Sequence, residues 1–196
     1  MDGSIKIAVS GKGGVGKTTI AALLCRALRD KGYTVLAVDA DPAASMPSAL
    51  GFAEDAHLTP VVEMRELIEE RTGAQPGTTG SFFKLNPQVD DLPERLWKEH
   101  EGIKLLLMGT VTQGGGGCIC PESALLRMLM QNLLLYRREA VIMDMEAGIE
   151  HLGRATAQAV DRLIIVVEPG RRSMETAFKI RKLAEDIGLR KTALIA

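Results

Sequence analysis

The chain has 196 residues, a formal net charge of −1 at pH 7 and 46% hydrophobic residues, so we expect one domain with a sizeable core over residues 1–196. This charge gives no electrostatic footprint for nucleic acid, and no apolar run reaches the roughly 18 residues of a membrane span. Because the first residues also lack the charged and apolar regions of a secretory signal, we expect a cytoplasmic protein that binds neither nucleic acid nor membrane.

Strand-like and helix-like segments alternate along the chain. Strands are expected at Lys6–Ser10, Thr34–Asp39, Lys104–Met108, Ala140–Asp144 and Leu163–Val167, and helices at Lys17–Lys31, Pro60–Arg71, Glu122–Leu135 and Ser173–Ile187. Several of these strands are continuous apolar runs, which are typical of strands buried on both faces. The pattern predicts the α/β class, with a doubly wound, mostly parallel sheet and helices on both faces.

The connection 73–102 interrupts this alternation with scattered proline, glycine and polar residues. A connection of that length is more often functional than filler. Its aromatic residues Phe82, Phe83 and Trp97 are expected to pin it to the body of the domain. The alternative is a surface on which a partner docks.

A phosphate-binding motif lies between the first strand and the first helix. Residues 11–19 fit the pattern G-x-x-x-x-G-K-[ST] in the strand–loop–helix setting that the pattern requires. The glycines allow backbone N–H groups to face phosphate oxygens, and the helix directs its positive end to the same place. We expect Lys17 to reach the β and γ phosphates and the Thr18 hydroxyl to hold Mg²⁺. The sequence therefore predicts a nucleoside triphosphate site of the P-loop NTPase type, made by Gly11, Lys12, Gly13, Gly14, Val15, Gly16, Lys17, Thr18 and Thr19.

A second lysine, Lys12, stands inside this loop. In this position it resembles the early lysine of the deviant phosphate loop in the MinD, ParA and nitrogenase iron-protein superfamily. The resemblance implies a dimeric ATPase in which Lys12 crosses to the partner subunit's nucleotide, so that nucleotide state controls dimerisation. The alternative is a solvated surface lysine.

Two acidic clusters follow predicted strands, at the edge where ligands bind in sheets of this kind. After the second strand come Asp39 and Asp41, which by the same resemblance support the metal shell and orient the attacking water, respectively. Lys12, Lys17 and Asp41 are thus the expected catalytic residues. Asp39 and Asp41 can alternatively be read as acids that only end a strand. The apolar run 140–143 ends in Asp144, which is expected to contact Mg²⁺, with the backbone of Gly148 close to the γ-phosphate.

The three cysteines fall into two groups. Cys25 lies within a predicted helix and is expected to be a small buried hydrophobe. Cys118 and Cys120 form a Cys-x-Cys pair after four glycines, and in a cytosolic protein such a pair indicates metal or redox chemistry. Two thiolates near a helix's positive end supply half of a four-sulfur site, and a dimer would supply the other half. Such a site suits Zn²⁺ or an iron–sulfur cluster.

The chain as a whole resembles the CooC-type ATPases that mature carbon monoxide dehydrogenase. The segments that carry this resemblance are Glu69–Gly73, Phe83–Pro87, Met108–Thr110, Gly114–Glu122 and Asp144–Arg154. It implies a homodimer that uses ATP, ADP and Mg²⁺ and holds Ni²⁺ or Zn²⁺ between two cysteine pairs. Its implied partner is apo carbon monoxide dehydrogenase, into whose cluster it assists nickel insertion. Because relatives continue beyond 191–196, we also expect the family's C-terminal portion to be lacking.

Two other functions stay open at this stage. One is a positioning ATPase of the MinD or ParA kind, which would bind membrane or DNA. The other is an iron–sulfur scaffold or electron-transfer ATPase, although the related nitrogenase iron protein spaces its cluster cysteines far apart and scaffold ATPases favour Cys-x-x-Cys.

Overall fold

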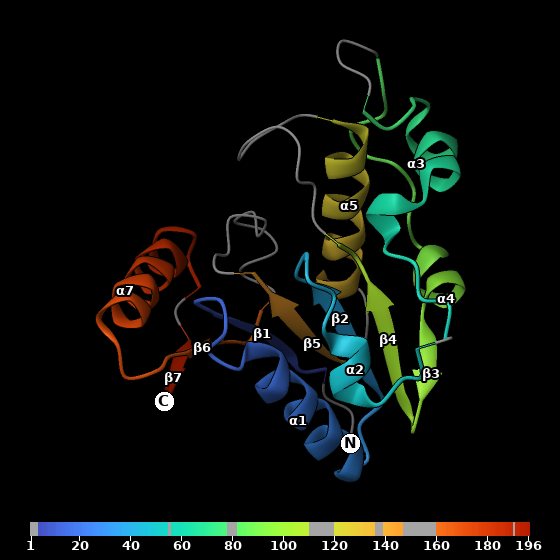
Figure 1. Cartoon of the computed structure of the whole chain (residues 1–196). Coiled ribbons are helices and arrows are strands. Elements are labelled where there is room, and N and C mark those ends of the chain that lie inside the picture. Colours follow the sequence, from blue (N-terminus) through green and yellow to red (C-terminus); the bar gives the residue numbers. More distant parts are fainter. Residues whose placement is uncertain are drawn as a thin grey trace.

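The computed structural model describes residues 4–54, 56–77, 82–109, 120–135, 139–146, 160–189 and 191–196. Within these residues a seven-stranded sheet runs through the centre in the order β3-β4-β2-β5-β1-β6-β7 (Figure 1). The strands are β1 (Lys6–Gly11), β2 (Val35–Ala40), β3 (Lys98–His100), β4 (Ile103–Leu107), β5 (Ala140–Met145), β6 (Arg162–Val166) and β7 (Thr192–Ile195). Neighbouring strands are parallel except for the pair β3–β4. The predicted fold class, a doubly wound and mostly parallel sheet, is confirmed.

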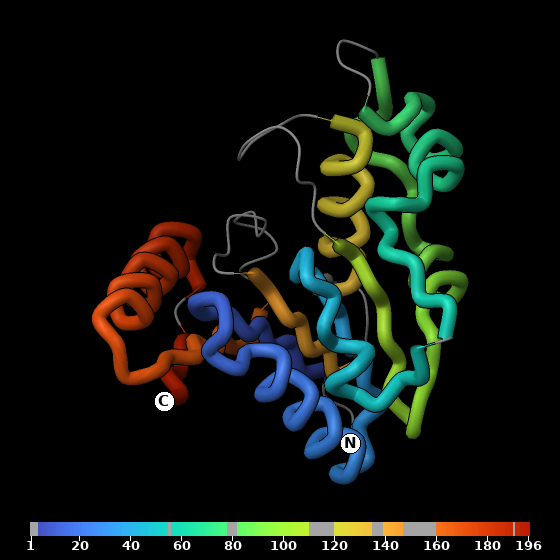
Figure 2. Tube along the Cα trace, viewed as in Figure 1, coloured from blue at the N-terminus to red at the C-terminus, as the bar shows by residue number. Residues whose placement is uncertain are grey.

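Helices cover both faces of the sheet, as the path of the chain in Figure 2 shows. Helices α1 (Lys17–Asp30) and α2 (Met46–Leu50) pack on one face, and α3 (Arg65–Thr72), α4 (Leu92–Leu96), α5 (Pro121–Leu135) and α7 (Arg171–Asp186) pack on the other. Strand β2 is continuously apolar because both of its faces are covered by helices. Val35 and Ala37 face the first group of helices, and Leu36 and Val38 face the second.

Several elements differ from the predicted ones, among them the short helices α2 and α4, which were not predicted. The expected helix Pro60–Arg71 is split into a short 3-10 turn, η1 (Val61–Glu63), and α3, because the N–H of Val62 donates to the Met108 carbonyl at 3.2 Å. That bond ties the first turn to the end of β4 instead of to a helix. Strand β3 was not predicted, because this three-residue antiparallel edge strand carries only lysine, glutamate and histidine.

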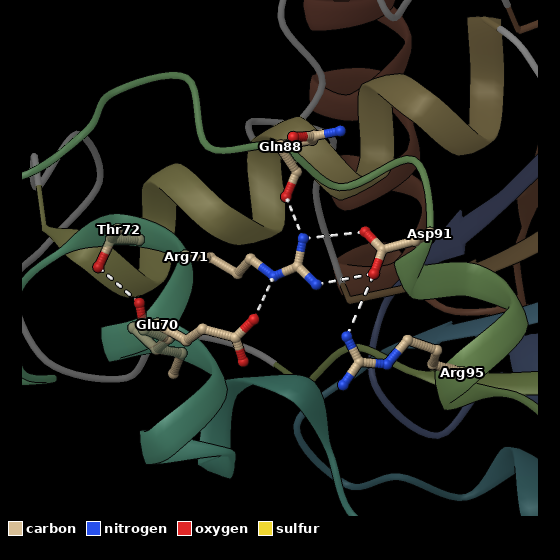
Figure 3. A network of polar contacts seen from close by, with 7 residues as sticks. Glu70, Arg71, Thr72, Gln88, Asp91 and Arg95 are labelled. Atoms are coloured by element: carbon tan, nitrogen blue, oxygen red, sulfur yellow. Dashed lines mark hydrogen bonds and ion pairs between the residues drawn. The ribbon is translucent and has the colours of Figure 1, made fainter.

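Polar contacts help to fasten the connection between α3 and α4. The Arg71 guanidinium donates to both Asp91 oxygens at 2.9 and 2.7 Å and to the Gln88 carbonyl at 3.3 Å, and Arg95 donates to Asp91 at 3.1 Å (Figure 3). The bond from Arg71 is the largest of the effects that lower the pKa of Asp91 to about 2. Since Asp91 directly precedes α4, this network joins the end of α3 to the start of α4.

The aromatic residues of this connection behave differently from one another. Trp97 packs against the core as expected, and the Lys104 ammonium lies 4.0 Å from its ring centroid. Phe82 is fully exposed (101%), so the prediction that it pins the connection is wrong. Two hydrogen bonds hold the chain next to Phe82 instead. Arg127 donates to the Leu85 carbonyl at 3.1 Å, and the Lys84 N–H donates to the Thr72 carbonyl at 2.8 Å.

Gly11, the last residue of β1, allows β1 and β6 to lie close together. Its φ of +155° is one that other residues rarely adopt, and a Cβ at this position would collide with the Val166 carbonyl oxygen of β6. Gly14, in the same loop, has φ +83°, but no atom lies within 4 Å of the place that a Cβ would take. The loop therefore needs glycine for two separable reasons.

We expect Gly11→Ala to lower the free energy of unfolding by about 2–4 kcal/mol, because strain and overpacking add. Gly14→Ala is the matched control and is expected to cost only the backbone strain, about 1–2 kcal/mol. Urea unfolding of the nucleotide-free variants measures both values. Equal losses in the two variants would show that the approach of β6 to Gly11 does not constrain the fold.

Candidate functional site

The candidate site lies at the carboxyl edge of the sheet, where β1, β2 and β5 end side by side. Asp39 on β2 is the register partner of Asp144 on β5, and Asp144 is also opposite Val9 on β1. The next segment after β1 is the phosphate loop, and α1 begins at Lys17 (Figure 1). The two acidic clusters and the phosphate loop, which are far apart in the sequence, are therefore brought together at one edge.

The phosphate loop presents open backbone. Gly16 has φ +89° and precedes the first residue of α1, while Gly13, Gly14 and Gly16 are exposed and have open space where a Cβ would project. Within the described part of the chain, no contact requires glycine at Gly13, so this space fits a ligand that approaches the backbone closely. Val15 packs against the core, and Thr19 is exposed.

A short hydrogen bond joins the loop to β5. The Thr18 hydroxyl donates to Oδ2 of Asp144 at 2.6 Å, whereas Oδ1 of Asp144 is buried and accepts no hydrogen bond from the residues that the structure describes. Burial, with help from neighbouring carboxylates, raises the pKa of Asp144 to about 6 despite the bond from Thr18 and the nearby Lys17. A hydroxyl beside a carboxylate with one unpaired oxygen fits Mg²⁺, which prefers oxygen ligands.

The two aspartates after β2 have different surroundings. Both oxygens of Asp39 accept backbone N–H groups, from Asp41 at 3.1 Å and from Met46 at 2.9 Å, so this carboxylate holds the turn that leads into α2. Burial is the main reason why the pKa of Asp39 is raised. Asp41 lies 3.7 Å from the Lys17 ammonium, and both side chains are largely buried. The predicted phosphate-binding lysine thus faces the predicted water-positioning acid.

Lys12 contacts an acid that sequence reasoning missed. Its ammonium lies 3.0 Å from Oε1 of Glu168, and both side chains are partly exposed. The backbone N–H of Glu168 donates to the buried Ser173 hydroxyl at 3.1 Å, which fixes the segment between β6 and α7. The sequence did contain a signal that could have identified Glu168 as a site residue. Glu168 comes just after an apolar strand, and the same kind of position identified Asp39 and Asp144.

Of the predicted metal-binding cysteines, Cys120 lies within the described residues, whereas Cys118 lies outside them, as does Gly148. Cys120 directly precedes α5, and its sulfur accepts the Ser123 N–H at 3.4 Å while its thiol donates to the Ser123 hydroxyl at 3.1 Å. Burial is the largest of the effects that raise the pKa of the Cys120 thiol, and it outweighs these two bonds. In the part of the chain that the structure describes, no three metal-ligating side chains form a cluster.

Cys25 is completely buried in α1, as predicted, and burial raises the pKa of its thiol to about 12. It packs among the apolar residues on the α1 face of the sheet. Cys25 is therefore a packing residue.

The family model of the CobQ/CobB/MinD/ParA nucleotide-binding domain matches residues 6–191. This chain belongs to that family. Within it, the chain is 55% identical over 98% of its length to the carbon monoxide dehydrogenase accessory protein CooC of Rhodospirillum rubrum, of which it covers 73%. It is 49% identical over 97% of its length to an uncharacterised ATP-binding protein of Methanocaldococcus jannaschii, of which it covers 74%. The predicted CooC-type resemblance is confirmed.

Solved structures of the family share the fold at low sequence identity. A chain of the MinC–MinD cell division protein complex of Aquifex aeolicus aligns with a TM-score of 0.64 at 21% identity, over 97% of this chain and 67% of that one. Cobyrinic acid a,c-diamide synthase of Mycobacterium smegmatis, solved with ADP and magnesium, aligns with a TM-score of 0.63 at 21% identity, over 97% and 72%. None of the helices in the described ranges has the length and apolar character needed to cross a bilayer.

The raised pKa of Asp144 predicts a pH dependence of stability in this family member. Between about pH 4, the ordinary value, and pH 6 the native state binds more protons than the unfolded chain, so stability falls as pH rises through that window. Without Mg²⁺, we expect Asp144→Asn to be more stable than the natural protein by about 2–3 kcal/mol at pH 7.5 and no more stable at pH 4.

Urea unfolding at the two pH values measures this difference. Asp30→Asn, which neutralises an exposed acid of α1, is the control and is expected to change little at either pH. If Asp144→Asn stabilised the protein equally at both pH values, the loss of stability at pH 7.5 could not be assigned to ionisation of the buried Asp144 carboxyl.

Proposed function

We propose that this protein is a Mg²⁺-dependent ATPase that binds nickel, dimerises with nucleotide and assists nickel insertion into carbon monoxide dehydrogenase. The observation that carries this proposal is the 55% identity to CooC, an accessory protein of that enzyme, over nearly the whole chain. The geometry of the phosphate loop and of Thr18 with Asp144 supports the nucleotide half of the proposal.

The nucleotide roles follow from position and charge. The loop amides and Lys17 would bind the phosphates, Thr18 and Asp144 would hold Mg²⁺, and Asp41 would position the attacking water once Lys17 turns from it to phosphate. Bound Mg²⁺ would neutralise charge that develops on the phosphates. Asp39 would keep the segment that carries Asp41 in place through its two backbone bonds.

The metal roles fall on the Cys-x-Cys pair. Cys118 and Cys120 of each subunit would bind Ni²⁺, with Zn²⁺ as a second metal that sulfur ligands accept. Since one pair supplies half of a four-sulfur site, the site would be completed in a homodimer. Closure of the dimer around ATP would then assemble the site, and hydrolysis would loosen it.

The other two functions have less support. The likeness to MinD and ParA structures lies at 18–22% identity and shows the fold alone. An iron–sulfur scaffold role rests only on the cysteine pair, which it shares with the nickel proposal.

A nickel titration of the reduced full chain, with and without ATP, tests the proposal. We expect about one Ni²⁺ per dimer, a sulfur-to-nickel absorption band, and tighter binding with ATP because the two equilibria are coupled. Molecular mass is measured on the same samples. Nickel that binds to a monomer regardless of nucleotide would contradict the shared site.

Two cysteine variants sharpen the titration. Cys118→Ala is expected to abolish nickel binding and leave ATP binding unchanged, while Cys25→Ala, the matched control, is expected to bind nickel normally because that thiol is buried on α1. Loss of both ligands in Cys118→Ala would indicate a folding role for the pair.

The Lys12–Glu168 contact generates a separate prediction about dimerisation. If Lys12 acts on the partner subunit's nucleotide, it must first leave Glu168. We therefore expect Lys12→Ala to weaken the ATP-dependent dimer and Glu168→Gln to strengthen it by roughly 1.5- to 5-fold, the range that an exposed ion pair supplies. Sedimentation equilibrium with ATP measures the change. Glu175→Gln, which breaks the exposed pair with Arg171 on α7, is the control, and an equal effect of that variant would exclude a specific role for Glu168.

A further inference from the structure

The outer face of α7 carries apolar side chains that the nucleotide site does not use. Met174 and Phe178 are 51% and 71% exposed, although folding usually buries residues of these types. They are four positions apart, so they adjoin on one ridge of the helix, and Lys182 continues that ridge four positions further on. A single exposed apolar residue needs no explanation, but two that adjoin on one ridge form an apolar patch.

This patch is separate from the face by which α7 packs. The helix lies at the end of the sheet where β6 and β7 are, and it contacts β1 and β6 (Figure 1). Its residues that are buried there are Ser173, Ala177, Ile180 and Ala184. Because these four residues hold α7 in place, Met174 and Phe178 are not needed to fasten the helix to the sheet.

The charges around the patch are mainly positive. Two acids of α7 are neutralised on the helix itself, since Glu175 lies 2.8 Å from Arg171 and Glu185 lies 3.1 Å from Arg181. The cations of α7 that form no ion pair within the described residues are Arg172, Lys179 and Lys182. Only Asp186 remains on the helix to balance them. The patch therefore has a basic surround, on a chain whose net charge is −1.

We propose that the outer face of α7 is the docking surface for a protein partner that offers an apolar pocket with an acidic rim. Apolar residues surrounded by charged ones are the usual anatomy of a protein–protein interface, in which an aromatic anchor often contributes most of the binding energy. The basic surround complements acidic groups of the partner and speeds their encounter. This inference rests on the proposed function, in which the partner is carbon monoxide dehydrogenase.

A membrane or a nucleic acid fits this face less well than a protein does. A helix that binds a bilayer surface inserts a broad apolar face, but the residues of α7 that would form such a face are already packed in the core. A nucleic acid is bound by cations that contact its phosphates, which accounts for Lys179 and Lys182 but not for the exposed Met174 and Phe178. A protein pocket with an acidic rim uses both the apolar and the basic residues.

Binding of the full chain to immobilised apo carbon monoxide dehydrogenase, with ATP present, tests this inference. We expect Phe178→Ser to weaken binding by about 10- to 100-fold, because it removes the aromatic anchor. Lys182→Gln is expected to weaken binding by about 2- to 5-fold and to reduce its dependence on salt. Leu23→Ser, which removes a half-exposed apolar residue of α1, is the matched control and is expected to bind normally.

Further measurements test the exposure of the face and the class of its partner. Phe178→Ser is expected to keep the melting temperature of the free protein, because this side chain is exposed. A clear fall in melting temperature would show that the face is covered within the chain and would overturn the inference. Vesicles of anionic lipid and a DNA duplex are expected not to bind. Binding of either one that is lost in Phe178→Ser would overturn the assignment of a protein partner.

The same binding measurement separates this inference from the function on which it rests. If the natural protein and Phe178→Ser bound the dehydrogenase equally well, α7 would not be the docking surface, and the proposed function would stand. If the natural protein did not bind the dehydrogenase at all, both would be overturned.

Discussion

The site depends on keeping a carboxylate charged in a buried place. Asp144 sits at the end of an inner strand with Asp39 across from it and Asp41 near by, so burial and like charge both oppose its ionisation. In the structure this cost is offset only in part, by the Thr18 hydroxyl and the Lys17 ammonium. Binding of a cationic ligand at this edge would offset the remaining cost of ionising Asp144. The ligand-free fold therefore favours cation binding at this edge.

Cys120 lies next to α5 and Asp144 lies on β5, and these two elements follow each other in the chain. Cys120 directly precedes α5, whose Leu125, Leu129 and Leu133 are fully buried against the sheet, and the strand after that helix, β5, carries Asp144 near its end. Residues of α5 and β5 belong to the same buried cluster, so a packed core connects the two elements. This arrangement offers a mechanical basis for coupling the two proposed ligand sites.

The parts that sequence reasoning could predict are those encoded by neighbouring residues. The phosphate loop is contiguous, and the apolar runs that end in Asp39 and Asp144 are readable as inner strands. Contacts between distant segments were not readable, since nothing local pairs Lys12 with Glu168 or Glu122 with Gly77. The short strand β3 was missed for a related reason, because an edge strand needs no apolar side chains.

The burial of Cys25 has a practical consequence. A thiol whose pKa is raised to about 12 and whose sulfur is closed off from solvent reacts very slowly with alkylating reagents at neutral pH. Mild labelling of the folded protein would therefore address the Cys-x-Cys motif without background from α1. A fluorophore attached there would report directly on the surroundings of the motif as nucleotide is added.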